Sequence, residues 1–194
     1  ESVIENEEQL SHRLPDLLKR YPTGILVEEY IIGKDITVPY IDGLNKKGHG
    51  VLSPVEYVFP TQSLQNRKYQ IYDYELKNEL SHLVEVKVPA DLTEEQVKKI
   101  QQNTKLIVES LGLRDFARVD FRLAENGALY FIEVNALPSF EPGAGLYSSA
   151  RLSGINQDED LIGHILNQVS KRHGANTKTR VRRKQLRVGF AYNQ

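Results

Sequence analysis

The chain has 194 residues, of which 40% are hydrophobic and 26% are charged, and its 25 Lys and Arg nearly balance its 26 Asp and Glu. This composition is too apolar for a disordered chain and too polar for a membrane protein, and no apolar run approaches the roughly 20 residues of a spanning helix. Because Cys is absent, we expect no disulfides, no thiolate metal site and a reducing, cytoplasmic location. The acidic start shows no signal-peptide pattern. Met is absent, including an initiator, so we expect a part of a longer protein.

The predicted elements begin with a helix. Asn6 and Gln9 are spaced as a helix cap, and apolar residues then recur at helical spacing until Pro22 ends the pattern. After it we predict strands 24–31, 36–41, 51–58, 83–86, 116–123 and 128–135, and helices 93–111, 146–152 and 158–170. Hairpin-type connections join several strands and the helices come singly, so we predict an α+β fold with a mainly antiparallel sheet and helices packed on one face.

One predicted hairpin turns at Asn126-Gly127, a pair typical of a two-residue type I′ turn. Such a turn determines which residues lie opposite each other. On one face the pairs would be Asp120 with Glu133 and Arg118 with Asn135, and on the other face Val119 with Val134, Phe121 with Ile132 and Leu123 with Tyr130. We therefore expect one apolar face in the core and one polar face on which two carboxylates meet.

Two carboxylates directly opposite each other on a sheet repel, so a compensating charge is expected. A divalent cation would supply it, because Asp120, Glu133 and the Asn135 carbonyl are oxygen ligands of the kind that Mg²⁺ prefers. Arg118 beside them would offer a fixed positive group to a phosphate or carboxylate. From geometry alone, a surface salt-bridge cluster is an equally good interpretation, and a one-residue slip of the register would destroy the pairing.

Four motifs, taken together, resemble those of one known family. They are 27–37 (VEEYIIGKDIT), 72–77 (YDYELK), 117–121 (ARVDF) and 132–135 (IEVN), the last followed by Pro138. In this order they resemble the C-terminal half of an ATP-grasp ligase, and within that superfamily the D-alanine:D-alanine ligase family. The resemblance covers residues 1–172 and implies the C-terminal subdomain of the ATP-grasp fold.

The resemblance also implies a role for individual residues. Glu28 and the Ile31 backbone would read the adenine, Tyr30 would pack near the base, Asp35 would hold the ribose hydroxyls and Lys77 would touch the γ-phosphate or the substrate. Asp120, Glu133 and Asn135 would hold two Mg²⁺ ions, for which Mn²⁺ could substitute, and Arg118 would stabilise the acyl-phosphate and tetrahedral species. Without the family, Glu28, Asp35 and Lys77 could be surface charges and Tyr30 a core residue.

The implied reaction is amide or peptide-bond formation by a carboxylate–amine ligase. ATP phosphorylates a carboxylate to an acyl phosphate, and an amine then displaces the phosphate. We expect small amino-acid-like substrates and no nucleic-acid or membrane partner, and a homodimer is compatible with the resemblance. Two alternatives stay open: a catalytically silent ATP-grasp module that acts as a nucleotide sensor or scaffold for a tandem partner, and a basic-tailed interaction domain.

Three departures limit what the resemblance implies. The family's glycine-rich loop and ATP-binding lysines are missing from this chain, so we expect the chain alone to be inactive. Asn78 stands where many relatives have Tyr, and 139–145 (SFEPGAG) replaces the Ser and Leu that take the substrate carboxylate. Glu141 adds a negative charge there and Phe140 adds bulk, so we expect an acceptor other than D-alanine, unless backbone N–H groups of 143–145 replace the Ser.

From Lys171 to the end the chain carries positive charges and no Asp or Glu. Residues 173–185 are predicted to be a basic linker, and 186–194 resemble the first strand of the N-terminal domain in the same family. The parent protein is therefore expected to hold a second ligase-like unit in tandem. A basic tail can also bind nucleic acid, but the lack of aromatic residues before Phe190 favours the linker.

Overall fold

The computed structural model describes residues 3–59, 69, 71, 76, 79–141 and 143–174. In chain order the elements are α1 (Glu7–Arg20), β1 (Gly33–Ile41), the short 3₁₀ helix η1 (Lys46–Gly48), β2 (Val55–Val58), the 3₁₀ helix η2 (Ser81–Leu83), β3 (Glu85–Lys87), α3 (Glu94–Leu111), β4 (Phe116–Ala124), β5 (Leu129–Asn135), α4 (Gly145–Leu152) and α5 (Asp158–Arg172). Lys77, the predicted strand 186–194 and all but the first two residues of the predicted linker lie outside the described residues. In the described part of the chain, no helix combines the length and apolarity needed to cross a membrane.

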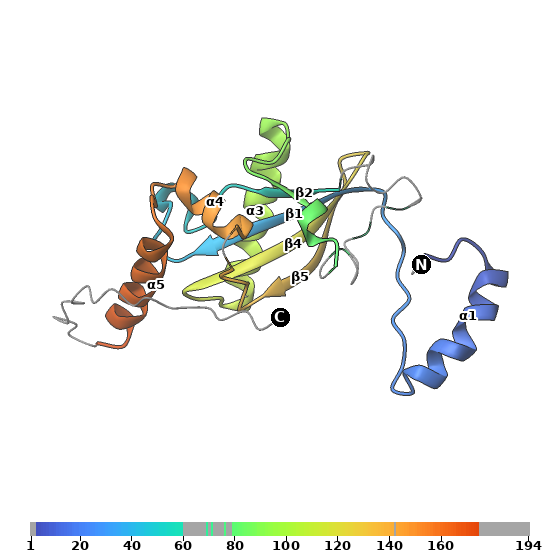
Figure 1. Cartoon of the computed structure of the whole chain (residues 1–194). Helices are drawn as coiled ribbons and strands as arrows, with labels where there is room; N and C mark the ends of the chain where they lie inside the picture. The colour runs from blue at the N-terminus through green and yellow to red at the C-terminus, as the bar shows by residue number, and fades with distance from the viewer. Residues whose placement is uncertain are drawn as a thin grey trace.

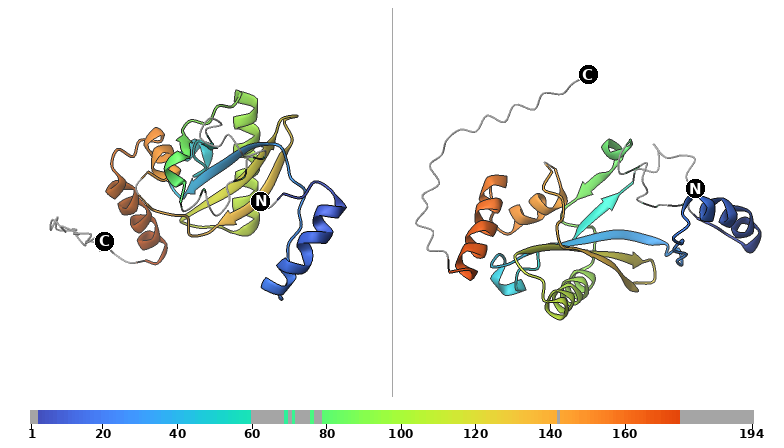
Figure 2. Two further views of the ribbon diagram at one scale, coloured as in Figure 1. Left: turned by 45° about the vertical axis from the view of Figure 1, so that its right-hand side comes forward. Right: turned by 90° about the horizontal axis from the view of Figure 1, so that it is seen from below.

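Five strands form one sheet in the order β3-β2-β1-β4-β5, and every neighbouring pair is antiparallel. α3 covers one face of this sheet, and α4 and α5 lie together at one end of it (Figures 1 and 2). The core beneath α3 combines side chains of β1, β4 and α3: Ile36, Val38, Val119, Phe121, Ile100 and Val108. A smaller core joins the sheet end to α4 and α5 through Ile41, Leu52, Leu146, Leu161 and Ile165. The predicted α+β fold with a mainly antiparallel sheet is confirmed.

The predicted strand 24–31 is wrong, because residues 24–32 run from α1 to β1 without strand pairing. α1 buries none of its residues and stands apart from the sheet (Figure 1). A strand needs a neighbour for its backbone hydrogen bonds. Among the described residues no strand pairs with this segment, so its β-type composition produces an extended connection and not a strand.

The predicted strand 51–58 is interrupted, and only its second half forms β2. Pro54 has no N–H to donate to a ladder, so it breaks the run. Its carbonyl accepts a hydrogen bond from the Ala90 N–H at 3.1 Å. Val51, before the break, forms a single isolated bridge with Tyr40.

The β4–β5 hairpin has the predicted register at the end away from its turn. Arg118 lies opposite Asn135, Val119 opposite Val134 and Asp120 opposite Glu133, as predicted. Nearer the turn the prediction is wrong by one residue, because Phe121 lies opposite Phe131 and Leu123 opposite Leu129. Ile132, predicted to face the core, is 58% exposed.

Two irregularities in the hairpin explain why the predicted register is correct at one end and shifted by one residue at the other. The turn is a three-residue loop, 125–127, since the Ala124 N–H donates to the Ala128 carbonyl at 2.9 Å. Gly127 has a positive φ of 80° and Asn126 does not, so the predicted type I′ turn is absent. A register shift, as in a β-bulge, then falls between Asp120 and Phe121 and leaves Ile132 without an opposite residue. The bulge cancels the error at the turn, so the polar pairs meet as predicted.

Gly33 opens β1 where the backbone of β4 comes very close. A Cβ at this position would lie 2.0 Å from the Leu123 carbonyl oxygen, and the φ of Gly33 is 155°. We expect Gly33→Ala to lower the free energy of unfolding by more than about 1 kcal/mol, because neither the backbone conformation nor the space suits a side chain. Gly163→Ala in α5 is the control, because a Cβ at this position would meet nothing within 4 Å. This variant should leave the free energy of unfolding unchanged or raise it by up to about 1 kcal/mol. Urea denaturation of both variants measures the difference, and equal stability would contradict the close approach.

Candidate functional site

The face of the sheet opposite α3 is polar along β1 and β4. Side chains alternate between the faces of a strand, so the neighbours of the core residues on β4 point to this side. The register places Asp35 opposite Arg122 and Thr37 opposite Asp120. β5 extends the same surface at its edge, where Glu133 lies opposite Asp120. The residues 118, 120 and 122 of β4 therefore form one line of charged side chains between β1 and β5.

One end of this line holds the predicted acidic cluster. The Asn135 Nδ2 donates to the Asp120 Oδ2 and to the Glu133 Oε1, each at 3.1 Å, so one amide touches both carboxylates. Arg118 donates from Nε and Nη2 to the two oxygens of Asp120, each at 2.7 Å. The four residues that the hairpin register predicts as neighbours thus lie within one hydrogen-bonded cluster.

The Arg118 guanidinium is fixed in this cluster rather than free in solvent. The side chains of Arg118 and Asp120 are 27% and 16% exposed. Burial by itself would lower the pKa of Arg118, but the hydrogen bonds and negative charge of Asp120, together with Tyr57 and Glu133, outweigh it and raise the pKa. The group is therefore a permanent, oriented cation at the rim of the acidic cluster.

The donor set of this cluster suits a hard divalent cation. Asp120 and Glu133 supply carboxylate oxygens, which are typical Mg²⁺ ligands. The amide of Asn135 already lies within hydrogen-bonding distance of both carboxylates, and a half-turn of its terminal torsion would present Oδ1 in place of Nδ2. Three oxygen donors on neighbouring strands can thus converge on one ion, with Arg118 beside them for an anionic partner of that ion.

The other end of the line is organised by Arg122, a residue that the sequence analysis missed. Its Nε donates to the Ile31 carbonyl at 2.8 Å, and its Nη1 lies 2.7 Å from the Asp35 Oδ1. Its guanidinium carbon lies 5.6 Å from the centre of the Tyr30 ring. Three residues that the resemblance assigns to the nucleoside are thereby brought together on one arginine. The alternation with Arg118 and Asp120 on β4 could have placed Arg122 on this face, but it does not reveal the partners of its guanidinium.

Two other predicted site residues are not part of this arrangement. Glu28 is exposed in the connection between α1 and β1. Lys77 lies outside the described residues. Their predicted roles therefore stay predictions.

Phe140, which is predicted to add bulk to a substrate pocket, is partly buried and packs toward the smaller core. Its ring packs edge-on against Phe116 and Tyr147, with ring centres 5.0 and 6.2 Å apart, at the border of the smaller core. The Tyr147 hydroxyl also donates to the Phe140 carbonyl at 3.0 Å. Glu141, by contrast, is exposed. The loop before α4 turns its aromatic side chain inward and leaves its carboxylate in solvent.

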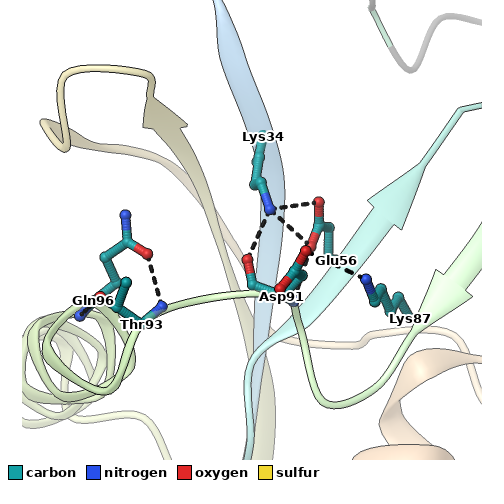
Figure 3. Close-up of polar contacts among 6 residues, drawn as sticks. All are labelled: Lys34, Glu56, Lys87, Asp91, Thr93 and Gln96. Atoms are coloured by element: carbon teal, nitrogen blue, oxygen red, sulfur yellow. Dashed lines mark hydrogen bonds and ion pairs between the residues drawn. The ribbon is translucent and has the colours of Figure 1, made fainter.

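A separate polar cluster lies on the α3 side of the sheet (Figure 3). The buried Glu56 carboxylate accepts from the Asp91 N–H at 3.0 Å and lies 3.2 Å from the Lys34 Nζ, which also donates to the Asp91 carbonyl at 2.7 Å. These bonds join β1, β2 and the loop before α3. Lys34 borders a cavity of about 480 Å³ near the start of α3. Because each polar group named here is satisfied by the others, the cluster serves to hold the fold together.

A protein-family model described as "D-ala D-ala ligase C-terminus" matches residues 2–167. Among curated relatives, a D-alanine–D-alanine ligase of Fervidobacterium nodosum is 36% identical over 159 residues, which is 81% of this chain and 46% of that protein. One of Geobacillus kaustophilus is 34% identical over 154 residues, covering 79% of this chain and 38% of that protein. The chain thus spans less than half the length of these two relatives.

Solved structures of similar fold include two that are similar over most of this chain. A D-alanyl-alanine synthetase A of Vibrio cholerae has a TM-score of 0.65 at 23% identity, over 86% of this chain and 47% of that one. A D-alanine–D-alanine ligase of Bacillus anthracis complexed with ATP has a TM-score of 0.61 at 20% identity, over 88% of this chain and 50% of that one. At this level of identity the likeness establishes the fold.

Proposed function

The chain belongs to the D-alanine–D-alanine ligase family, matched by its C-terminal model over residues 2–167, and on this basis we propose that it carries the metal and nucleoside sites of an ATP-dependent carboxylate–amine ligase. The observation that carries the proposal is the cluster in which Asn135 joins Asp120 and Glu133 beside the fixed Arg118. At the other end of the same line, Arg122 contacts Ile31, Asp35 and Tyr30. The relatives named above are ligases, and one solved neighbour was complexed with ATP.

In this proposal ATP lies along the β4 line, with its phosphates at the acidic end. Asp120, Glu133 and Asn135 would hold Mg²⁺, or Mn²⁺ in its place, and the ion would offset the negative charge of the triphosphate. The nucleoside would lie at the other end, with Asp35 as acceptor for ribose hydroxyls and the Ile31 backbone at the base. Asp120 and Arg122 are two positions apart on β4, about 7 Å at roughly 3.3 Å per residue, so one nucleotide can reach both ends.

Arg118 would act on the acyl group. A carboxylate substrate attacks the γ-phosphorus, the bond between this phosphorus and the β–γ bridging oxygen breaks, and ADP leaves. The acyl phosphate that results carries negative charge on its phosphoryl oxygens. A guanidinium held by Asp120 in one orientation is already placed for this charge and needs no reorganisation during the reaction. The amine then attacks the acyl carbon, and the phosphate leaves with the oxygen that came from the substrate carboxylate.

The amine-binding end would lie at the loop before α4. The N-cap residue of α4, Ala144, makes no side-chain hydrogen bond to the helix, so nearby backbone N–H groups could receive an acceptor carboxylate. The exposed Glu141 would oppose such a carboxylate. Because Phe140 packs inward, the proposal that the acceptor differs from D-alanine rests on Glu141 alone, and small amino acids are the substrate class that we propose.

ADP release by the full-length protein tests the proposal. The assay offers Mg-ATP with pairs drawn from D-alanine, other amino acids and small carboxylates. We expect release that requires both a carboxylate and an amine and that stops when the divalent metal is chelated. ATP binding without ADP release from any pair would support the silent nucleotide-binding module instead.

A further inference from the structure

Arg122 has no role in the implied reaction, yet it is among the most constrained side chains on the polar face. Its side chain is 9% exposed. Its Nε donates to the Ile31 carbonyl at 2.8 Å, its Nη1 pairs with the Asp35 Oδ1 at 2.7 Å and its Nη2 lies 3.4 Å from the Tyr30 hydroxyl. All three guanidinium nitrogens thus point to residues of the nucleoside end. A buried arginine with this set of contacts is placed to organise protein groups, whereas the more exposed Arg118 is placed to meet an anion.

The contacts of Arg122 hold the chain on both sides of Ile31. Before it, the centre of the Tyr30 ring lies 5.6 Å from the Arg122 guanidinium carbon and 5.2 Å from the centre of the Tyr69 ring, and the two ring planes meet at 77°. After it, the Ile31 carbonyl is fixed by the Arg122 Nε. These contacts restrain the backbone on either side of the Ile31 N–H. The segment 24–32 pairs with no described strand, and these contacts tie its last residues to β4.

The same arginine sets the orientation of Asp35. The two residues lie directly opposite each other on β1 and β4, and the ion pair fixes the Asp35 carboxylate on the face that carries Asp120. Arg122 and Asp120 are two positions apart on β4 and share that face. A single rigid strand therefore carries both the metal-binding carboxylate and the group that positions the nucleoside contacts.

We propose that Arg122 is a positioning residue that fixes the Ile31 backbone and the Asp35 carboxylate for the base and ribose of ATP. This inference rests on the proposed function for the identity of the ligand. Loss of the guanidinium should weaken nucleotide binding and remove the contribution of the ribose hydroxyls, without changing the chemistry at the acidic end. The residue acts through Asp35 and Ile31, so its loss should change the affinity for ATP and the preference for ribose over deoxyribose.

The test is calorimetric binding of Mg-ATP and Mg-2′-deoxy-ATP to the full-length protein and to two variants. Arg122→Met keeps the length of the stem and removes every donor, and Arg122→Lys keeps the charge without the fork. Arg151→Met is the matched control, because Arg151 makes an exposed ion pair with Asp158 between α4 and α5. We expect Arg122→Met to weaken ATP binding about tenfold or more and to abolish the preference for ATP over 2′-deoxy-ATP, as loss of a charged hydrogen bond predicts. Arg122→Lys should bind ATP nearly as weakly as Arg122→Met does. Arg151→Met should bind both nucleotides as the wild type does.

Melting temperatures and steady-state kinetics separate the possible failures. If Arg122→Met lowers the melting temperature and leaves ATP affinity and the deoxy preference unchanged, Arg122 is only structural and the inference is overturned. A lower kcat with unchanged affinity would overturn it too, because the residue would then act on the chemical step. Wild-type binding without ligase turnover contradicts the proposed function alone and leaves this test intact, whereas a wild type that binds no ATP would overturn both.

Discussion

Replacing Asp120 with Asn is expected to lower amide formation by the full-length protein by about a hundredfold to a thousandfold at saturating ATP. The substitution keeps the size of the side chain and removes the charge that would hold a divalent cation and that orients Arg118 through two bonds of 2.7 Å. Removal of one preorganised charge-stabilising group from an active site typically has an effect of about this size. The measurement is the initial rate of ADP release with the best substrate pair.

Two further variants make this result specific. Asp91→Asn is the matched control, since the Asp91 side chain is 74% exposed and its carboxylate makes a surface ion pair with Lys87 at 3.5 Å. It should retain the wild-type rate. Glu133→Gln tests the same site through an exposed residue, so a loss of activity there is not due to unfolding. Rates within about threefold of wild type for both Asp120→Asn and Glu133→Gln would show that the cluster is not the reaction site.

Ile100→Ala is expected to lower the free energy of unfolding by about 2 to 5 kcal/mol. Ile100 lies on the inner face of α3, is fully buried and packs in the core beneath the sheet. The loss combines the transfer free energy of the removed carbons with the cost of the cavity that they leave. This core supports β4, which carries three of the charged residues of the candidate site. Denaturant unfolding followed by circular dichroism gives the value.

The control for this variant lies on the same helix. Leu106 is 61% exposed, so Leu106→Ala should change stability by no more than about 0.5 kcal/mol. The comparison also cancels most of the general effect of Ala on helix formation. If the two variants were equally stable, α3 would not cover the sheet with the face that helical spacing predicts.

Local sequence signals predict the structure correctly where contacts a few residues apart determine it. The capping box at Thr93 is present, with Gln96 N–H donating to Thr93 Oγ1 at 3.2 Å and Thr93 N–H donating to Gln96 Oε1 at 2.9 Å, and Gly112 ends α3 with a φ of 62°. Caps and helical spacing depend on residues a few positions apart, so the sequence contains what is needed. The alternation on β4 is likewise local and correctly separated core from polar residues.

The acidic cluster was predicted correctly although part of the reasoning was wrong. The sequence predicts a type I′ turn at Asn126-Gly127, but the structure has a three-residue loop that shifts the strand register by one residue. The bulge at Ile132 shifts the register back by one residue. A bulge of this kind leaves no pattern that alternation can detect, because it depends on how the edge strand β5 adapts to its neighbour. The pairing of Asp120 with Glu133 therefore needed the structure to establish it.

The contribution of Arg122 could not be predicted from alternation alone. Its partners Asp35 and Ile31 lie about 90 positions away in the sequence, and they meet it because β1 pairs with β4. Such a pairing between distant segments is set by the whole sheet. The wrong strand at 24–31 has the same origin, since whether an extended segment becomes a strand depends on the presence of a partner.

The transfer of an oxygen atom from the substrate carboxylate to phosphate distinguishes an acyl-phosphate mechanism from other routes to the amide. If this chain carries the site of a ligase that works through an acyl phosphate, the full-length protein will transfer one ¹⁸O atom from a labelled carboxylate substrate to inorganic phosphate for each amide bond formed. Mass spectrometry of the phosphate reads this out, and Asp120→Asn should lower the labelled and total phosphate together. Phosphate released without ¹⁸O while the amide accumulates would contradict the acyl-phosphate mechanism, and with it the account of this polar face.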